Sequence, residues 1–146
     1  DERDEVIDFT QNYTQPDPSA YLALSADADL AGGVIAAQTG TIQASHVAST
    51  GATLIEFATP DETVAAVKNG EADAVLADKS YLAPIADADS EVILLEQEEL
   101  IGGGVGMGLR ESDAEMREKF DAAIASMKAD GTLNALIAKW DVGAQF

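Results

Sequence analysis

The chain has 146 residues, enough for one domain of ordinary size, and 47% of them are hydrophobic. It holds 27 acidic residues against 8 basic ones, and the resulting net charge of −19 argues against nucleic acid and anionic membrane as partners. It contains no cysteine, which excludes disulfide scaffolds and thiolate metal sites. It also has no apolar run of the roughly 18 residues that a membrane-spanning helix needs.

From residue 33 onward, short apolar segments alternate with helical patterns. The segments predicted as strands are 33–37, 53–57, 73–77 and 91–95. The clearest helix is 60–69, with Thr59 and Glu62 forming a capping box at its start. Pro60 suits its first position, and Gly70 ends the pattern. This alternation predicts βαβ units and therefore a mostly parallel sheet with right-handed crossovers.

Two features depart from this simple alternation. Pro84 predicts that the helix after residue 78 is short or kinked. The glycine-rich segment 102–108 lacks the Gly-Lys-Ser/Thr ending of a phosphate loop, and no acidic residue follows at the spacing of a dinucleotide site. We therefore expect an extended, flexible crossing segment there.

Two amphipathic helices are predicted in the last part of the chain. Ser112 and Glu115 indicate a capping box that opens the first helix, and Gly131 closes it. The second helix covers 132–140. Both helices carry apolar residues every three or four positions and so require an apolar partner surface; these residues include Phe120, Ile124, Leu136 and Trp140.

The segment Gln38–Gln43 links the predicted strand 33–37 to a predicted helix. A tight turn at Gly40 followed by a helix N-terminus directs backbone N–H groups toward one point, which favours an anion. The hydroxyls of Thr39 and Thr41 can add hydrogen bonds. The alternative interpretation is a helix-capping turn without a ligand.

Asp78 follows the predicted strand 73–77, where the chain turns into the next helix. If the strand 33–37 lies beside it, Thr41 and Asp78 both project from the carboxyl edge of the sheet, where open α/β sheets bind ligands. An anion site beside a carboxylate suits a zwitterion, such as the α-carboxylate and α-ammonium of an amino acid. The alternative is that Asp78 only caps the helix that follows.

Catalysis has little support in the sequence. His46 is the only histidine, and Ser45 next to it points in a different direction on a helix, so the two do not form a dyad. No spacing of His, Asp and Glu suits a metal ion. We therefore predict a binding protein rather than an enzyme, without a metal or a cofactor.

Several short motifs, each weak alone, occur together along essentially the whole chain. They are Glu2-Arg3 with Val6–Thr10 and Tyr13, Gln38–Thr41, Gly70–Asp78, Asp130–Thr132 and Lys139-Trp140. Together they resemble the polar amino-acid-binding branch of the type 2 periplasmic solute-binding proteins (family 3), which supply ABC transporters. The resemblance implies two α/β lobes, joined by two crossing strands, that close on a ligand.

The resemblance also implies a role for each residue of the binding site. Arg3 matches an arginine that grips the ligand α-carboxylate, and Thr41 with its neighbours matches a carboxylate-binding turn. Asp78 matches the acid that receives the α-ammonium, and Gln43 lies where a polar or side-chain-contacting residue often occurs. Ile42 departs from the usual threonine or serine, so a backbone contact would survive there but a hydroxyl contact would not. The predicted ligand-binding residues are Arg3, Thr39, Thr41, Ile42, Gln43 and Asp78.

By the same resemblance, the chain divides into four parts. Residues 1–29 match the end of the first lobe and the first hinge strand, 30–99 the second ligand-binding lobe, 100–110 the second hinge strand and 111–146 the C-terminal helices. The expected fold is an α/β, three-layer αβα lobe with a mostly parallel sheet, hinge strands and C-terminal helices, which is half of a type 2 periplasmic binding protein. Asp1 in place of methionine indicates a processed chain or a part of a longer one.

The residues of this chain match little of the family's first lobe. In the family the C-terminal helices pack largely on that lobe, so we expect this chain to form homo-oligomers through them.

The function expected is a periplasmic or extracytoplasmic protein that binds a polar or basic amino acid, or an opine, for a membrane permease. Two alternatives share the fold: a cyclohexadienyl-type dehydratase, for which Asp78 is the only candidate acid, and the ligand-sensing domain of a membrane receptor.

Overall fold

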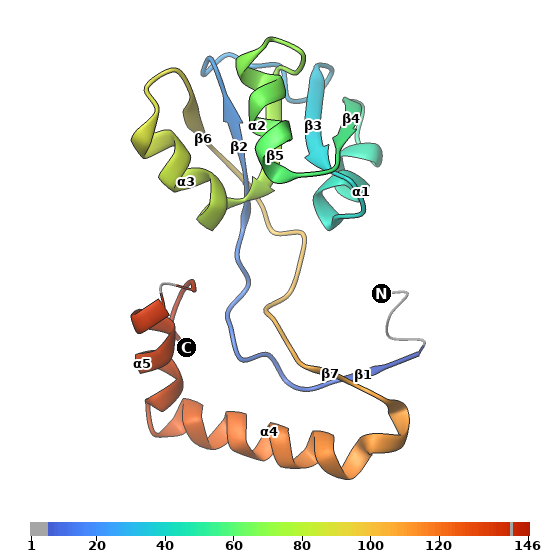
Figure 1. Ribbon diagram of the computed structural model, residues 1–146, viewed down its shortest axis with the longest axis vertical. Coiled ribbons are helices and arrows are strands. Elements are labelled where there is room, and N and C mark those ends of the chain that lie inside the picture. The colour runs from blue at the N-terminus through green and yellow to red at the C-terminus, as the bar shows by residue number, and fades with distance from the viewer. Residues whose placement is uncertain (1–5, 141) are drawn as a thin grey trace. The chain divides into compact units, whose positions relative to one another are not determined.

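The computed structural model describes residues 6–140 and 142–146 and divides the chain into two compact units (Figure 1). The larger unit is Pro18–Gly102, and the smaller one combines Asp1–Asp17 with Gly103–Phe146. In the described part of the chain, no helix has the length and apolar character needed to cross a membrane.

The larger unit contains a sheet with the strand order β4-β3-β5-β2-β6. Its strands are β2 (Ser19–Ala23), β3 (Val34–Gln38), β4 (Thr53–Phe57), β5 (Ala74–Asp78) and β6 (Ile93–Glu99). β3 pairs in parallel with β4 and β5, whereas β2 pairs antiparallel with β5 and β6. Four strands therefore share one direction, and the predicted mostly parallel sheet is confirmed with all four predicted strands in it.

Helices cover both faces of this sheet and give the three predicted layers (Figure 1). They are α1 (Ile42–Ala48), α2 (Pro60–Lys68) and α3 (Lys79–Ala88), and the last contains Pro84. Alternate residues of each strand point to opposite faces. Leu22 and Val75 pack on one face with side chains of α2 and α3, whereas Ile35 and Leu76 pack on the other face with Val47 of α1.

The capping signals in the sequence are right at one helix and wrong at another. At α2 the predicted box is present, because Thr59 accepts from the Glu62 amide and the Glu62 carboxylate accepts from the Thr59 amide at 3.0 Å. At α4 (Ala114–Ala129) the box predicted for Ser112 and Glu115 is wrong. Ser112 belongs instead to a 3-10 turn, η2 (Glu111–Asp113), and Asp113 takes the cap position without a side-chain hydrogen bond.

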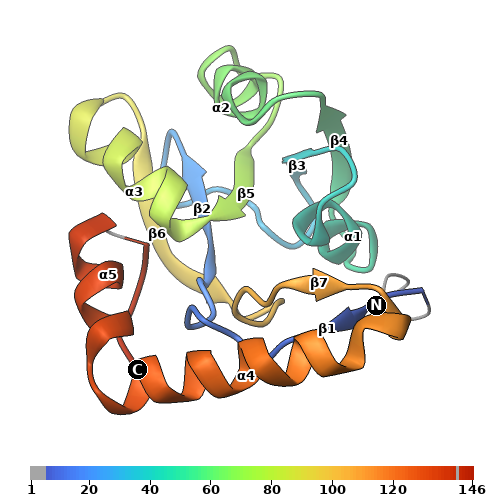
Figure 2. The same cartoon turned by 60° about the horizontal axis from the view of Figure 1, so that its bottom comes forward.

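The glycine-rich segment runs beside residues 10–14 of the smaller unit. The Thr10 amide donates to the Met107 carbonyl at 3.0 Å, and the short strands β1 (Asp8–Phe9) and β7 (Gly108–Leu109) continue this contact as an antiparallel pair (Figure 2). A Cβ at Gly104 would lie 1.9 Å from the carbonyl oxygen of Thr14. Close approach of two backbones therefore accounts for glycine at this position, and the segment is extended, as predicted.

The two C-terminal helices are present as predicted, α4 and α5 (Thr132–Trp140), with Gly131 at φ +78° between them. Ile124 is buried with Leu133 and Ile137, so this side chain finds its apolar partners within the two helices. Three further apolar side chains do remain exposed: Phe120 at 39%, Leu136 at 40% and Trp140 at 66%.

The contribution of β2 to the core can be tested with a matched pair of leucines. Leu22 is 0% exposed, whereas Leu24 is 48% exposed. Leu22→Ala should lower the free energy of unfolding by about 2–5 kcal/mol, because it leaves a cavity beneath α2 and α3. Leu24→Ala should lower it by about 0.5 kcal/mol or less. Urea unfolding followed by far-ultraviolet circular dichroism measures both, and equal losses would contradict this account of the core.

Candidate functional site

The candidate site lies at the carboxyl edge of the sheet. β3 and β5 are parallel neighbours, so the turn after β3 and the last residue of β5 reach the same edge. The strand arrangement assumed for Thr41 and Asp78 is therefore present. β2 runs the other way, which places its first residue, Ser19, at this edge and directly opposite Asp78 in the strand register.

Thr41 closes the turn between β3 and α1. Its hydroxyl accepts a hydrogen bond from the Ala44 amide at 3.2 Å and donates one to the Gln38 carbonyl at 2.7 Å. Gly40 in this turn has φ +75°, a left-handed conformation that favours glycine. The single hydroxyl proton of Thr41 is thus used within the turn, where this hydroxyl caps α1.

Backbone N–H groups remain the feature of this turn that suits an anion. The Thr39 amide is not one of them, because it donates to the Phe57 carbonyl at 2.9 Å. Ile42 and Gln43 are the first two residues of α1, and helix geometry gives their amides no acceptor within the helix. No other acceptor contacts these two amides among the described residues. Ile42 has no side-chain hydroxyl, so this position can offer an anion only its backbone N–H.

Asp78 occupies the cap position of α3 but makes no side-chain capping bond there. Its Oδ1 instead accepts from Nε2 of Gln43 at 2.6 Å. The alternative in which Asp78 only caps α3 is therefore wrong. Asp78 is an exposed residue, and a carboxylate accepts from several donors at once, so the side chain suits a cationic group at this edge.

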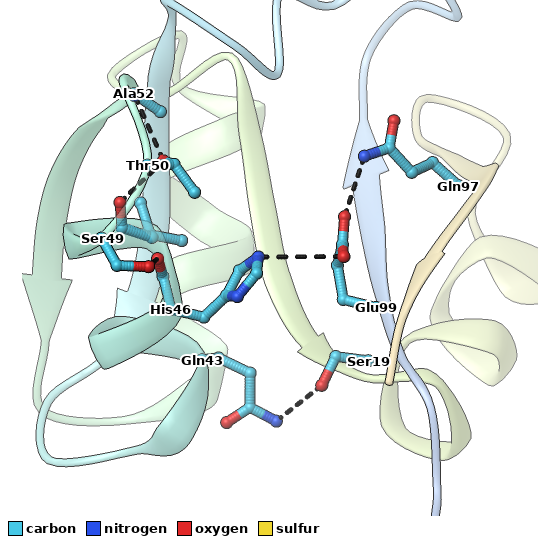
Figure 3. A network of polar contacts seen from close by, with 9 residues as sticks. Ser19, Gln43, His46, Ser49, Thr50, Ala52, Gln97 and Glu99 are labelled. Atoms are coloured by element: carbon cyan, nitrogen blue, oxygen red, sulfur yellow. Dashed lines mark hydrogen bonds and ion pairs between the residues drawn. The ribbon is translucent and has the colours of Figure 1, made fainter. Parts of the chain in front are cut away.

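Gln43 connects α1 to two strands of the sheet. Its side chain is only 6% exposed, and the same Nε2 atom lies 3.1 Å from Oγ of Ser19 (Figure 3). Ser19 was not predicted as a site residue because β2 itself was not predicted: all five of its residues are buried, so the strand shows no alternation of polar and apolar positions.

The polar groups at this edge line a small pocket of about 90 Å³. It is bordered by Gln38, Thr41, Gln43, Pro60, Thr63, Leu76, Ala77, Asp78 and Tyr81. Pockets that bury a whole small-molecule ligand measure roughly 300–1,000 Å³. The pocket at this edge is therefore well below the size of a complete ligand pocket.

The other residues considered in the sequence lie elsewhere. Nε2 of His46 is 3.8 Å from a carboxylate oxygen of Glu99, on the side of α1 that faces β6 (Figure 3). His46 and Glu99 border a different cavity from the one at Asp78. Arg3 lies outside the described residues. Within the described part of the chain, no three His, Cys, Asp or Glu residues are grouped so as to hold a metal ion.

The family model for bacterial extracellular solute-binding proteins, family 3, matches residues 1–143. The chain belongs to this family. A histidine-binding periplasmic protein of Salmonella typhimurium is 30% identical over 156 residues, which cover 96% of this chain and 60% of that protein. This family 3 chain thus spans about 60% of the length of the curated relatives it matches.

Solved structures of the family agree with the fold. A periplasmic His/Glu/Gln/Arg/opine family-binding protein from Silicibacter pomeroyi, crystallised in complex with lysine, is 64% identical with a TM-score of 0.85. The match covers 95% of this chain and 64% of that one. An ancestral arginine-binding protein bound to arginine is 26% identical with a TM-score of 0.80, over 96% of this chain and 66% of the other. The partial type 2 periplasmic binding protein fold is therefore confirmed.

Tyr81 is a member of the pocket lining that the sequence did not indicate. Its hydroxyl donates to Oδ1 of Asp61 at 2.8 Å and so links α3 to α2. Burial, and then the hydrogen bond and negative charge of Asp61, raise the pKa of Tyr81 from 10.0 to about 12.

This shift predicts how stability changes in alkaline solution. The folded state holds the Tyr81 proton more tightly than the unfolded chain does. The stability that this tighter binding contributes is complete below the unfolded pKa of 10.0 and is lost as the pH rises toward about 12. An NMR titration of the tyrosine ring carbons should give Tyr81 a pKa near this value, and Asp61→Asn should lower it. Asp87→Asn, at an exposed position of α3, is the control and should leave it unchanged; a Tyr81 that titrates like a free tyrosine would refute the assignment.

Proposed function

We propose that this chain supplies one ligand-binding lobe of an extracytoplasmic solute-binding protein, which takes up a polar or basic amino acid for the permease of an ABC transporter. The observation that carries this proposal is the carboxylate of Asp78, held at the sheet edge by Gln43 beside the N–H groups that begin α1. Membership of family 3 supports it independently.

The two ends of a zwitterion match the two kinds of group at this edge. The α-ammonium of the ligand donates to the Asp78 carboxylate, in a charge-assisted hydrogen bond. The α-carboxylate accepts from the N–H groups of Ile42 and Gln43, where the positive end of the helix dipole adds to the attraction. Arg3, outside the described residues, is the second proposed partner of that carboxylate.

A basic amino acid is the ligand favoured by the available observations. The relative with 64% identity was crystallised with lysine, and the more distant ancestral protein with arginine. The net charge of −19 raises the local concentration of cations around the chain relative to that of neutral or acidic amino acids. We therefore place lysine and arginine first, ahead of histidine, glutamine and the opines.

The small size of the pocket has a consequence for affinity. Binding must compensate for the lost freedom of the ligand, and contacts from about 90 Å³ of pocket cover only part of an amino acid. We expect weak binding by this chain alone. In the complete protein, closure of a second lobe over the ligand would supply the remaining contacts and create the form that the permease recognises.

Titration of the isotope-labelled chain with lysine tests the proposal. Lysine should shift the amide signals of Ile42 and Gln43 with a millimolar dissociation constant. Asp78→Asn should weaken binding about tenfold or more, because a hydrogen bond to a charged group is lost. Asp87→Asn removes the same charge from an exposed position on α3 and should have no effect. No lysine-dependent shift at this edge, or equal effects of the two variants, would contradict the proposed function.

We further propose that the chain self-associates through α4 and α5. Phe120, Leu136 and Trp140 of these helices are all exposed, and apolar groups gathered on adjoining helices favour association. Sedimentation velocity at micromolar concentration should show dimers or larger species, and Trp140→Glu should shift the distribution toward monomer. Leu24→Glu, at an exposed leucine of the larger unit, should not. A monomer at all concentrations would refute this proposal.

A further inference from the structure

We propose that Gln43 is a positioning residue: it serves the ligand by holding the Asp78 carboxylate, with Ser19 as its anchor, and its side-chain N–H groups do not contact the ligand. This inference rests on the proposed function for its consequence in binding. It concerns the contacts of the Gln43 side chain with Asp78 and Ser19.

Both N–H donors of the Gln43 side chain are used within the protein. A glutamine side chain has one amino group with two hydrogens and one carbonyl oxygen. Nε2 of Gln43 lies 2.6 Å from Oδ1 of Asp78 and 3.1 Å from Oγ of Ser19, so both hydrogens have acceptors within the protein. The amide can therefore offer the ligand no N–H group without giving up one of these bonds.

Ser19 is a buried anchor for the Gln43 side chain. Ser19 is 1% exposed and lies opposite Asp78 in the pairing of β2 with β5. Gln43 is 6% exposed and belongs to α1. A buried hydroxyl on one strand thus fixes the amide that reaches the carboxylate on the next strand. Asp78, by contrast, is exposed, and its hydrogen bond from Gln43 restricts its side chain before the ligand arrives.

Gln43 also joins the two halves of the proposed site. Its backbone N–H is one of the free amides at the start of α1, whereas its side chain holds the carboxylate at the end of β5. One residue thereby fixes the distance between the group that meets an α-carboxylate and the group that meets an α-ammonium. A substitution that keeps the backbone and removes the side-chain amide should impair only the group that meets the α-ammonium.

Gln43→Leu makes that change with little difference in size. The matched control is Gln38→Leu, because Gln38 lines the same pocket but donates to the Ala58 carbonyl instead of Asp78. Ser19→Ala removes the anchor alone. It is the second variant in case Gln43→Leu disturbs α1.

The first measurement needs no ligand. The couplings between the Hα and Hβ protons of Asp78 should indicate a single χ1 rotamer in the unaltered chain and averaging among rotamers in Gln43→Leu. Ser19→Ala should show partial averaging, and Gln38→Leu none. Unchanged couplings in Gln43→Leu would overturn the inference whatever the ligand affinity.

The second measurement compares lysine with 6-aminohexanoate, which lacks the α-ammonium. Gln43→Leu should weaken lysine binding about tenfold and leave 6-aminohexanoate unaffected, and in an Asp78→Asn background it should add no further loss. Equal losses for both compounds, or additive losses with Asp78→Asn, would show that Gln43 contacts the ligand directly and would overturn the inference. If the unaltered chain binds neither compound while the couplings change as expected, the proposed function fails and the positioning role stands.

Discussion

The parallel pairing of β3 with β5 is the constraint on which the candidate site depends. The register joins Ile35 to Ala74 and Ala36 to Val75, so both strands end at the same edge of the sheet. Because each strand is followed at once by a turn into a helix, the beginning of α1 and the carboxylate at the end of β5 are brought together by the fold itself. Ligand sites in open α/β sheets arise at this edge for the same reason.

Antiparallel β2 adds what the parallel strands alone could not provide. Its reversed direction brings the beginning of a strand, and with it the Ser19 hydroxyl, to an edge that otherwise holds strand ends. Gln43 then binds Ser19 and Asp78 with one amide, and the site becomes rigid from three elements at once. The polar groups are partners of each other because burying the Gln43 amide without acceptors would be costly.

Much of this fold could be predicted from local signals in the sequence. Thr59, Pro60 and Glu62 define the start of α2 because capping depends on neighbouring residues only, and the apolar segments from residue 33 onward are regular enough to indicate βαβ units. β2 escaped prediction because a buried strand has no polar positions that would mark its period. The same local rule failed at Ser112, where an extra 3-10 turn precedes α4 and moves the cap.

The site itself shows a similar division between local and long-range information. The sequence indicated Thr41, Gln43 and Asp78 as residues of interest, yet their contacts follow from strand order and register. The Thr41 hydroxyl, for example, donates to the Gln38 carbonyl and accepts from the Ala44 amide only once the turn has formed. Spacing alone therefore cannot distinguish a side chain that meets a ligand from one that holds its neighbour in place.

The acidity of the whole chain and the carboxylate of Asp78 act over different distances. A neutral zwitterion gains little from the field of a net charge of −19, so its attraction to the site depends on short contacts at Asp78 and at the start of α1. Lysine and arginine carry one further positive charge, which this field attracts before any contact forms. Salt shortens the reach of the field to about 8–10 Å at ordinary ionic strength but leaves hydrogen bonds at contact distance largely intact. Long-range charge would thus favour basic ligands by raising the rate at which they arrive, while Gln43 and Asp78 would determine how long they stay.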